Sequence, residues 1–307
     1  MKALIICGPT GSGKSALALD LAKEFNGVII NADSIQVYRE LKILSARPAE
    51  KEIQQVPHRL FGIMSMHAAC SVGIWREMAI ASIADCERSG RLPILCGGTG
   101  MYVRYLLGEL SNIPKIPALI RNSTHNKLKR IGNVEFKRLL VDRDPVSQKN
   151  IATGDTQRLL RAWEVLEFTG KPISVWHKEQ GNTELENDFY SVLLMPSREK
   201  LYSSCDNRFV EFIRRGAVSE VEQIKDLNLK SGLPAIKALG LTELSQYLDG
   251  EIGLDTAIEL AQRETRRYAK RQMTWFRNQL KEDYLVETNE DLNIKSKLKF
   301  NILNFLE

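Results

Sequence analysis

The sequence is poor in cysteine and has no long apolar run. Its five cysteines among 307 residues are odd in number and scattered, and no two have C-x-x-C spacing, which argues against a disulfide framework and a structural zinc site. No window approaches about 18 uncharged apolar residues, so we expect no membrane-spanning helix. The chain enters a strand-like run at its second residue, so we expect no signal or transit peptide. Together these absences predict a cytoplasmic protein with reduced cysteines.

The overall composition is that of a globular protein. Apolar residues make up 43% and charged residues 26%, and the length fits two domains or one domain with a large insertion. The net charge of +5 is compatible with nucleic acid but is weak evidence by itself. The positions of the basic residues therefore matter more than their total.

The most informative motif lies at the start of the chain. An apolar run over residues 2–7 leads into the pattern G-x-x-x-x-G-K-S, and an apolar-periodic segment follows. This order of strand, loop and helix predicts a phosphate-binding loop (P-loop), whose backbone N–H groups and helix N-terminus face phosphate oxygens. Lys14 would reach the terminal phosphates, and the Ser15 hydroxyl suits Mg²⁺. The alternative is a glycine-rich turn that binds nothing. The loop comprises Gly8, Pro9, Thr10, Gly11, Ser12, Gly13, Lys14 and Ser15.

A second apolar run, over residues 27–33, predicts a buried strand that ends in Asp33. Ligands of open α/β sheets collect at the carboxyl ends of the strands, so we expect Asp33 on the same edge as the P-loop. The polar segment after it contains Ser34 and Gln36. An alternative role for Asp33 is that of a helix N-cap, and one residue can serve both roles.

The next expected strand, over residues 91–96, ends unusually. In an ordinary P-loop NTPase an aspartate follows such a strand and holds Mg²⁺, but here the chain continues with Gly97, Gly98 and Thr99. Glycines there allow a ligand to approach the backbone closely, and the Thr99 hydroxyl can bond an oxygen without adding negative charge. A plain turn is the alternative for the two glycines. The missing aspartate argues against a motor or switch ATPase.

The order of the remaining elements predicts an interrupted α/β fold. We expect a P-loop NTPase-like parallel sheet in residues 1–111, a helical insertion in 112–186, and completion of the core in 187–307 with a helical C-terminal region. Two unrelated domains are the alternative. Strand candidates follow at 58–63 and 189–195, and helices at 72–88, 156–168, 201–214, 217–227 and 254–280. The apolar residues of the tail (Phe300, Ile302, Leu303, Phe305) are expected to pack back on the core.

Basic side chains concentrate on two of the expected helices. Gln157 and Arg161 share one face of the first helix, with Arg158 beside them and Leu159 and Leu160 on the opposite side. The long helix carries a stripe of Arg263, Arg267, Lys270 and Arg271. Such a stripe is often only a solvated face. Two basic helices beside a phosphate site, with Trp275 and Phe276 able to pack or stack nearby, favour RNA binding instead.

These motifs resemble those of the tRNA dimethylallyltransferases (tRNA isopentenyltransferases) over nearly the whole chain. The matching segments are GPTGSGKS at 8–15, NADSIQVYREL at 31–41, PHRL at 57–60, LCGGTGMYVRYLLGEL at 95–110, DTQRLLRAWEVLEFTGKPIS at 155–174 and RRYAKRQMTWFRN at 266–278. The resemblance implies transfer of the dimethylallyl group of dimethylallyl diphosphate to N6 of adenosine 37, beside the tRNA anticodon, with release of diphosphate.

The resemblance also implies a role for particular residues. Asp33 matches the catalytic aspartate that takes a proton from the adenine amine, and Thr99 matches the threonine near the oxygen bridging dimethylallyl and diphosphate. The P-loop, Mg²⁺ bound with Ser15, and Arg208 would stabilise the leaving diphosphate. Residues implied to contact the anticodon stem-loop are Asp33, Ser34, Ile35, Gln36, Thr99, Arg121, Gln157, Arg158, Leu159, Leu160, Arg161, Lys237, Gly240 and Thr242.

Three departures from the family pattern lie on the expected tRNA side. The usual R-x-V-G-Y-R is replaced by KALGLT at 237–242, I-H-P-N-D is replaced by IATGD at 151–155, and the region 115–135 is short, so that Arg121 does not align cleanly with the usual arginine. We therefore expect tRNA affinity or choice to differ, with the chemical centre unchanged.

Three other functions fit parts of the pattern. An adenylate isopentenyltransferase acting on AMP or ADP would need neither the insertion nor the basic helix. A small-molecule or nucleotide kinase would also use the P-loop. A non-catalytic RNA-binding module would leave Asp33, Thr99 and the P-loop without a purpose. Nothing in the sequence demands more than a monomer.

Overall fold

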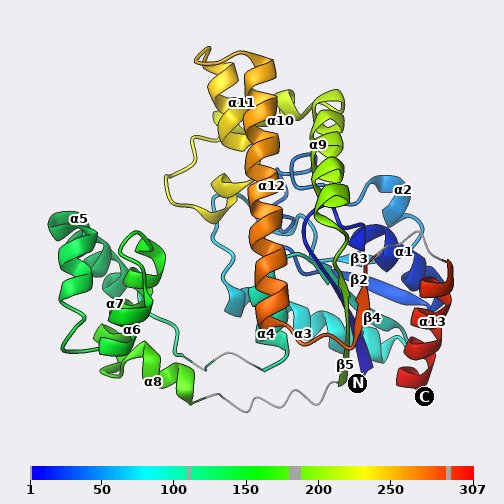
Figure 1. The fold of residues 1–307 in the computed structure, drawn as a ribbon, viewed down its shortest axis with the longest axis horizontal. Coiled ribbons are helices and arrows are strands. Elements are labelled where there is room, and N and C mark those ends of the chain that lie inside the picture. Colours follow the sequence, from blue (N-terminus) through cyan, green and yellow to red (C-terminus); the bar gives the residue numbers. More distant parts are fainter. Residues whose placement is uncertain (1, 109–110, 112, 180–187, 288–291) are drawn as a thin grey trace. The chain divides into compact units, whose positions relative to one another are not determined.

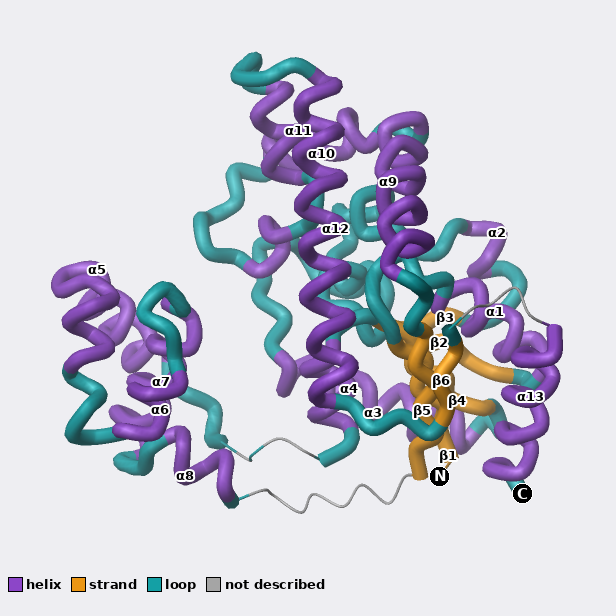
Figure 2. The backbone as a smooth tube through the Cα atoms, viewed as in Figure 1, coloured by secondary structure: helices purple, strands orange, loops and turns teal. Residues whose placement is uncertain are grey.

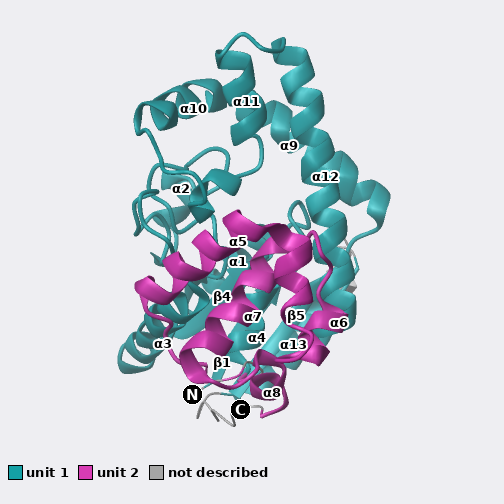
Figure 3. Cartoon of the chain, turned by 90° about the vertical axis from the view of Figure 1, so that its left-hand side faces the viewer, with its two compact units in different colours: residues 1–107, 185–307 teal, residues 108–184 magenta. Residues whose placement is uncertain are grey.

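The computed structural model describes residues 2–108, 111, 113–179, 188–287 and 292–307 (Figure 1). They divide into two compact units, coloured separately in Figure 3: unit 1 is residues 1–107 and 185–307, and unit 2 is residues 108–184. The insertion boundaries expected at 112 and 186 lie outside the described residues.

Unit 1 is built on one parallel sheet. Among the described residues, six strands pair in the order β3-β2-β4-β1-β5-β6. The strands are orange in Figure 2. They are β1 (Lys2–Cys7), β2 (Gly27–Asn31), β3 (His58–Arg59), β4 (Leu92–Gly97), β5 (Asp188–Leu194) and β6 (Tyr284–Val286). The four long strands agree with the sequence prediction, because strands buried on both faces read as continuous apolar runs. The strand predicted at 58–63 has only two residues, and β6 has no counterpart among the predicted strands.

Helices cover both faces of the sheet. Side chains alternate between the faces along each strand, so each strand contributes to two apolar clusters. Leu4 and Ile6 of β1 share one apolar cluster with α1 (Lys14–Glu24) and α13 (Leu292–Leu306). Ala3, Ile5 and Cys7 join the other cluster, with helices α3 (Val72–Arg88) and α4 (Gly100–Leu106) and the C-terminal helices. Because the strands are packed on both faces, the loops that leave their carboxyl ends start from fixed positions.

Besides α13, the described C-terminal residues of unit 1 form four α-helices, three of which match the predicted helices. They are α9 (Arg198–Arg214), α10 (Ala217–Asp226), α11 (Leu241–Leu248) and α12 (Leu254–Gln279), with the 3₁₀ turn η1 (Pro234–Lys237) between α10 and α11. A short helix α2 (Glu50–Ile53) precedes β3. Helix α12 packs on α9 and α11 (Figure 1). Phe276 is fully buried and Trp275 packs over Gly100, so both aromatic rings pack on the core, which is one of the two roles suggested for them.

The C-terminal tail only partly behaves as predicted. Ile302 is fully buried against the α1 face of the sheet, and Phe305 packs on the same cluster. Phe300 and Leu303 are 62% and 50% exposed, so their predicted packing is wrong. The reason is helical geometry, since α13 can turn only one face toward the sheet.

Unit 2 consists of helices around its own apolar core. Its helices are α5 (Ala118–Arg138), α6 (Pro145–Asn150), α7 (Thr156–Thr169) and α8 (Ile173–Lys178), and its described residues form no strand. Trp163 lies in the core beside Phe136, and its indole N–H donates to the Phe136 carbonyl at 3.1 Å. In the described part of the chain, no helix is long and apolar enough to cross a membrane.

Candidate active site

The P-loop leaves β1 and closes over the start of α1. Gly11 and Gly13 have φ values of 81° and 87°, which turn the loop back toward the helix. The Ser12 N–H donates to the Pro9 carbonyl at 3.2 Å, and the Lys14 ammonium donates to the same oxygen at 3.2 Å. Gly13 occupies the N-cap position of α1, so the N–H groups of the first helical turn are available to an anion.

The P-loop opens into a cavity of about 380 Å³ in unit 1, called here the main cleft. Its wall includes four cationic residues, Lys14, Arg208, Lys237 and Arg271, but only one carboxylate, Asp33, among the described residues. A site with this charge balance favours an anionic ligand. Other residues of the wall are Thr10, Ser15, Ser34, Ile35, Gln36, Leu44, Ser45, Ala46, Cys205, Phe209, Phe212, Pro234, Leu239, Thr265 and Tyr268.

Two of these cations are held close to the loop in a desolvated setting. Burial lowers the pKa of both Lys14 and Arg208, and the charge of Asp33 opposes this for each. The Arg208 guanidinium donates to the Thr10 hydroxyl, while its buried Nε has no hydrogen-bond partner among the residues described. Buried cationic N–H groups are costly unless an acceptor reaches them. The geometry therefore suits phosphate oxygens.

Asp33 reaches the same cleft from the end of β2. Its Oδ1 accepts the Ile35 N–H at 2.9 Å, and its own N–H donates to the Asn31 Oδ1 at 2.8 Å. The Asn31 amide group, fully buried, donates to the carbonyls of Asp33 and Leu60. Residues 34–37 form a turn and not a helix, so the N-cap alternative is wrong: Asp33 caps a turn.

Thr99 lies beside Asp33 but is not part of the cleft wall. Its hydroxyl accepts the Ser34 N–H at 2.9 Å and donates to the Ser34 hydroxyl at 3.3 Å. Thr99 therefore binds the segment that presents Asp33.

The glycines before Thr99 are required by packing within the protein. A Cβ at Gly97 would lie 2.1 Å from the backbone of Ala32, and one at Gly98 would lie 2.5 Å from the Gln272 amide nitrogen. The close approach predicted for a ligand is thus made by the chain itself. Neither glycine is a plain turn residue, because Ala32 and Gln272 occupy the space that a side chain would need.

The comparisons with known proteins identify the family. The family model described as IPP transferase matches residues 36–279, and that described as isopentenyl transferase matches residues 1–65. The chain belongs to the IPP transferase family.

Several relatives support the same assignment. The tRNA dimethylallyltransferase of Paramagnetospirillum magneticum is 44% identical over 278 residues, which cover 91% of this chain and 88% of that protein. That of Ehrlichia chaffeensis is 39% identical over 289 residues, covering 94% and 95%. These comparisons confirm the resemblance inferred from the motifs and do not favour the kinase or the adenylate enzyme.

Solved structures extend the similarity to the fold. The tRNA delta(2)-isopentenylpyrophosphate transferase of Staphylococcus epidermidis gives a TM-score of 0.69 at 30% identity, covering 100% of this chain and 99% of that chain. A eukaryotic dimethylallyltransferase described as acting on tRNA gives 0.83 at 26% identity, covering 99% and 79%. The P-loop-like α/β fold is therefore that of this family.

The candidate tRNA residues of this family member divide into three groups. Ser34, Ile35, Gln36 and Lys237 line the main cleft, and Thr242 is exposed on α11. Gly240 is buried, has a φ of 87°, and would place a Cβ 2.5 Å from Phe209, so its role is structural. The third group belongs to unit 2.

In unit 2, Gln157 and Arg158 are exposed on α7 and Arg161 is half-buried. Arg158 lies 3.3 Å from Asp155 and Arg161 lies 3.9 Å from Glu164. Arg121 donates to the Ile116 carbonyl. Leu159 and Leu160 are 0% and 6% exposed in the core, which corrects their assignment as side chains that contact tRNA.

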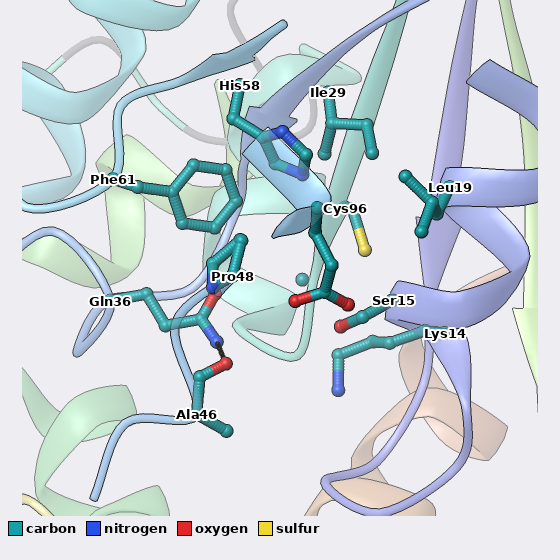
Figure 4. A pocket seen from close by; sticks show the side chains of 12 residues that line it. Lys14, Ser15, Leu19, Ile29, Gln36, Ala46, Pro48, His58, Phe61 and Cys96 are labelled. Atoms are coloured by element: carbon teal, nitrogen blue, oxygen red, sulfur yellow. Dashed lines mark hydrogen bonds between the residues drawn. The ribbon is translucent and has the colours of Figure 1, made fainter. Parts of the chain in front are cut away.

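A smaller cavity of about 60 Å³, the side pocket, is also lined by Lys14 and Ser15 (Figure 4). Its wall is largely apolar and includes Phe61, Pro48 and Cys96. The Gln36 amide donates to the Ala46 carbonyl at 3.0 Å and closes one side of it, as the dashed line shows. The two cavities are neighbours, because both are lined by Lys14, Ser15, Gln36 and Ala46.

Sequence reasoning misses part of the cleft wall. Thr265 and Tyr268 face it from α12, and burial raises the pKa of Tyr268. Gln272, one turn further on, contacts the P-loop. All three lie within or beside the segment 266–278, where the sequence pattern draws attention to the basic residues instead. In the parts of the chain that the structure describes, no cluster of three His, Cys, Asp or Glu residues could hold a metal ion.

Proposed function

We propose that this protein transfers the dimethylallyl group of dimethylallyl diphosphate to N6 of adenosine 37 in the tRNA anticodon loop and releases diphosphate. The observation that supports this most is the lining of the main cleft. Lys14 of the P-loop and Arg208 both face the cleft, and Asp33 is the one carboxylate among its described lining residues. The names of the relatives, tRNA dimethylallyltransferases, supply the substrate class.

The diphosphate belongs at the P-loop end of the main cleft. The backbone N–H groups of Gly8–Ser15, the Lys14 ammonium and the Arg208 guanidinium would surround its oxygens. They would stabilise the negative charge that grows on the leaving group, which is where electrostatic preorganisation lowers a barrier most. The hydrogen bond from Arg208 to Thr10 supports this placement.

The adenine amine would approach from the Asp33 side. Its N6 lone pair forms a bond to C1 of the dimethylallyl group, the C1–O bond breaks, and that electron pair leaves with the diphosphate. The N6 proton passes to the Asp33 carboxylate, a general-base contribution of about 10²- to 10⁴-fold. Thr99 would approach the bridging oxygen from beside Asp33, just outside the residues that line the cleft, and its hydrogen bonds to Ser34 support this position next to Asp33.

The site fits Mg²⁺ through the Ser15 hydroxyl together with diphosphate oxygens. Since the described residues offer no acidic cluster, the substrate would supply most ligands, as Mg²⁺ sites on phosphates often do. The ion would supply charge neutralisation on the diphosphate.

Both units would contribute residues that bind the anticodon stem-loop. Those of unit 2 are Arg121, Gln157, Arg158 and Arg161. Those of unit 1 are Lys237, Thr242 and the basic stripe of α12. Ser34, Ile35 and Gln36 would contact the loop next to Asp33. Extruding adenosine 37 costs less from a loop than from a duplex. We also propose that the protein works as a cytoplasmic monomer.

The direct test is incubation with dimethylallyl diphosphate, Mg²⁺ and either bulk tRNA or AMP, followed by mass analysis of nucleosides. N6-dimethylallyladenosine in tRNA supports the proposal. Modification of AMP alone, or ATP turnover without prenyl transfer, would overturn it.

A further inference from the structure

A single buried side chain joins the two halves of the site. Gln272 on α12 is 6% exposed. Its Oε1 accepts the Thr10 backbone N–H at 2.8 Å, and its Nε2 donates to the Gly98 carbonyl at 2.8 Å. These partners lie 262 and 174 positions away in the sequence. One amide therefore links the P-loop with the loop that follows β4.

Among side chains of this length, only glutamine meets both partners without a change in its ordinary protonation state. A backbone N–H can only donate and a carbonyl can only accept, so the orientation of the Gln272 amide is fixed by its neighbours. A carboxylate accepts but does not donate, a lysine or arginine donates but does not accept, and asparagine is one methylene shorter. Leaving either backbone group unpaired at this buried position would be unfavourable.

The two loops that Gln272 joins have different roles in the proposed site. Thr10 belongs to the phosphate loop and receives the Arg208 guanidinium on its hydroxyl. Gly98 precedes Thr99, whose hydroxyl holds Ser34 next to Asp33. The bridge thus sets the spacing between the groups around the leaving diphosphate and the segment that presents the base.

We propose that Gln272 is a positioning residue for the transfer reaction, which holds the diphosphate cradle and the Asp33 segment in register. It touches no substrate and acts through Thr10 and Gly98. This inference rests on the proposed function for its kinetic part, whereas the bridge itself can be tested without substrate.

The first variant is Gln272→Leu, which removes both hydrogen bonds while keeping an apolar side chain in the core. Each half of the site keeps its own contacts, so we expect kcat to fall about 10- to 100-fold while KM for dimethylallyl diphosphate changes less than about threefold. The matched control is Gln262→Leu on the same helix, which removes the hydrogen bond from Gln262 to the Asp206 carbonyl. The control should keep kcat at the wild-type value.

The second variant, Gln272→Glu, adds a pH signature that a purely structural role would not give. A protonated carboxyl can accept from Thr10 and donate to Gly98, whereas a carboxylate cannot donate. Burial raises the pKa of such a carboxyl, so protonation falls within an accessible range. The ratio of variant to wild-type kcat should therefore rise as pH is lowered.

A folded Gln272→Leu protein with kcat within about twofold of wild type would overturn the proposal. If that protein does not fold, the Gln272→Glu ratio decides, and a ratio independent of pH overturns it. The bridge is measured separately by hydrogen exchange of the Thr10 amide in the substrate-free protein. Slow exchange in the wild type that speeds up in Gln272→Leu supports the bridge, and equal exchange contradicts it. Absence of prenyl transfer by the wild type would instead count against the proposed function.

Discussion

Arg208 and Thr10 are joined by a hydrogen bond from the guanidinium to the threonine hydroxyl, across 198 positions of sequence. This contact brings α9 to the P-loop and adds a second positive charge beside Lys14. Under the proposed function, the P-loop is therefore only one half of the anion site, and the C-terminal region supplies the other half.

The first prediction concerns this arginine. Arg208→Ala removes a charged hydrogen-bond donor from the cleft, so the affinity for inorganic diphosphate should fall about 10- to 100-fold, measured by calorimetry. Arg214→Ala is the matched control, since Arg214 is exposed at the end of the same helix and pairs with Glu211. Equal affinities in the two variants would remove Arg208 from the anion site.

The second prediction separates chemistry from binding. Asp33→Asn keeps an oxygen that can accept the Ile35 N–H, so the turn should survive, but the amide cannot take a proton. We expect kcat to drop about 10²- to 10⁴-fold, with tRNA affinity changed less than about twofold. Single-turnover kinetics and a filter-binding assay would measure the two quantities. A variant that reacts at the wild-type rate would refute the general-base role.

The third prediction concerns α7. Changing both Arg158 and Arg161 to Ala should weaken tRNA binding and reduce the slope of log affinity against log salt by about one for each phosphate that the arginines neutralise. The control double variant is Arg88→Ala with Arg214→Ala, because both arginines also form i,i+3 ion pairs. An unchanged slope would place the tRNA surface elsewhere.

The fourth prediction follows from the lowered pKa of Lys14, which burial causes. As the pH rises, the Lys14 ammonium deprotonates before the ordinary lysine pKa of 10.5 is reached. The neutral amine binds diphosphate less well. Affinity for diphosphate should therefore decline with rising pH before that value is reached. Lys14→Arg remains charged throughout, so comparing the two proteins cancels the ionisation of the ligand itself. Parallel curves would contradict the prediction.

The part of the fold around the P-loop is predicted well from the sequence, and the reason is physical. The P-loop, β1 and the strands ending near Asp33 and Thr99 are local patterns, in which continuous apolar runs meet glycine-rich turns. Strand β6 escapes prediction because it has three residues and depends on contacts far away. It pairs with β5, and the Asp283 carboxylate before it accepts the Ser191 N–H at 2.7 Å.

The site residues likewise divide into those that can be predicted from the sequence and those that cannot. Lys14, Asp33 and Arg208 could be named from motifs and family resemblance. Gln272 could not, because its importance comes from two backbone groups that only the folded chain brings within reach. Leu159 and Leu160 show the opposite error, since a matching segment includes residues whose side chains only build the core.

The proposed reaction requires that the P-loop hold a leaving diphosphate while Asp33 receives an adenine of tRNA. It is tested most directly by incubating the protein with dimethylallyl diphosphate, Mg²⁺ and an anticodon stem-loop RNA, and counting diphosphate released against N6-dimethylallyladenosine formed. We predict equal amounts with adenosine at position 37 and neither product when guanosine replaces it. Diphosphate release without the modified nucleoside, or modification that ignores position 37, would contradict the account.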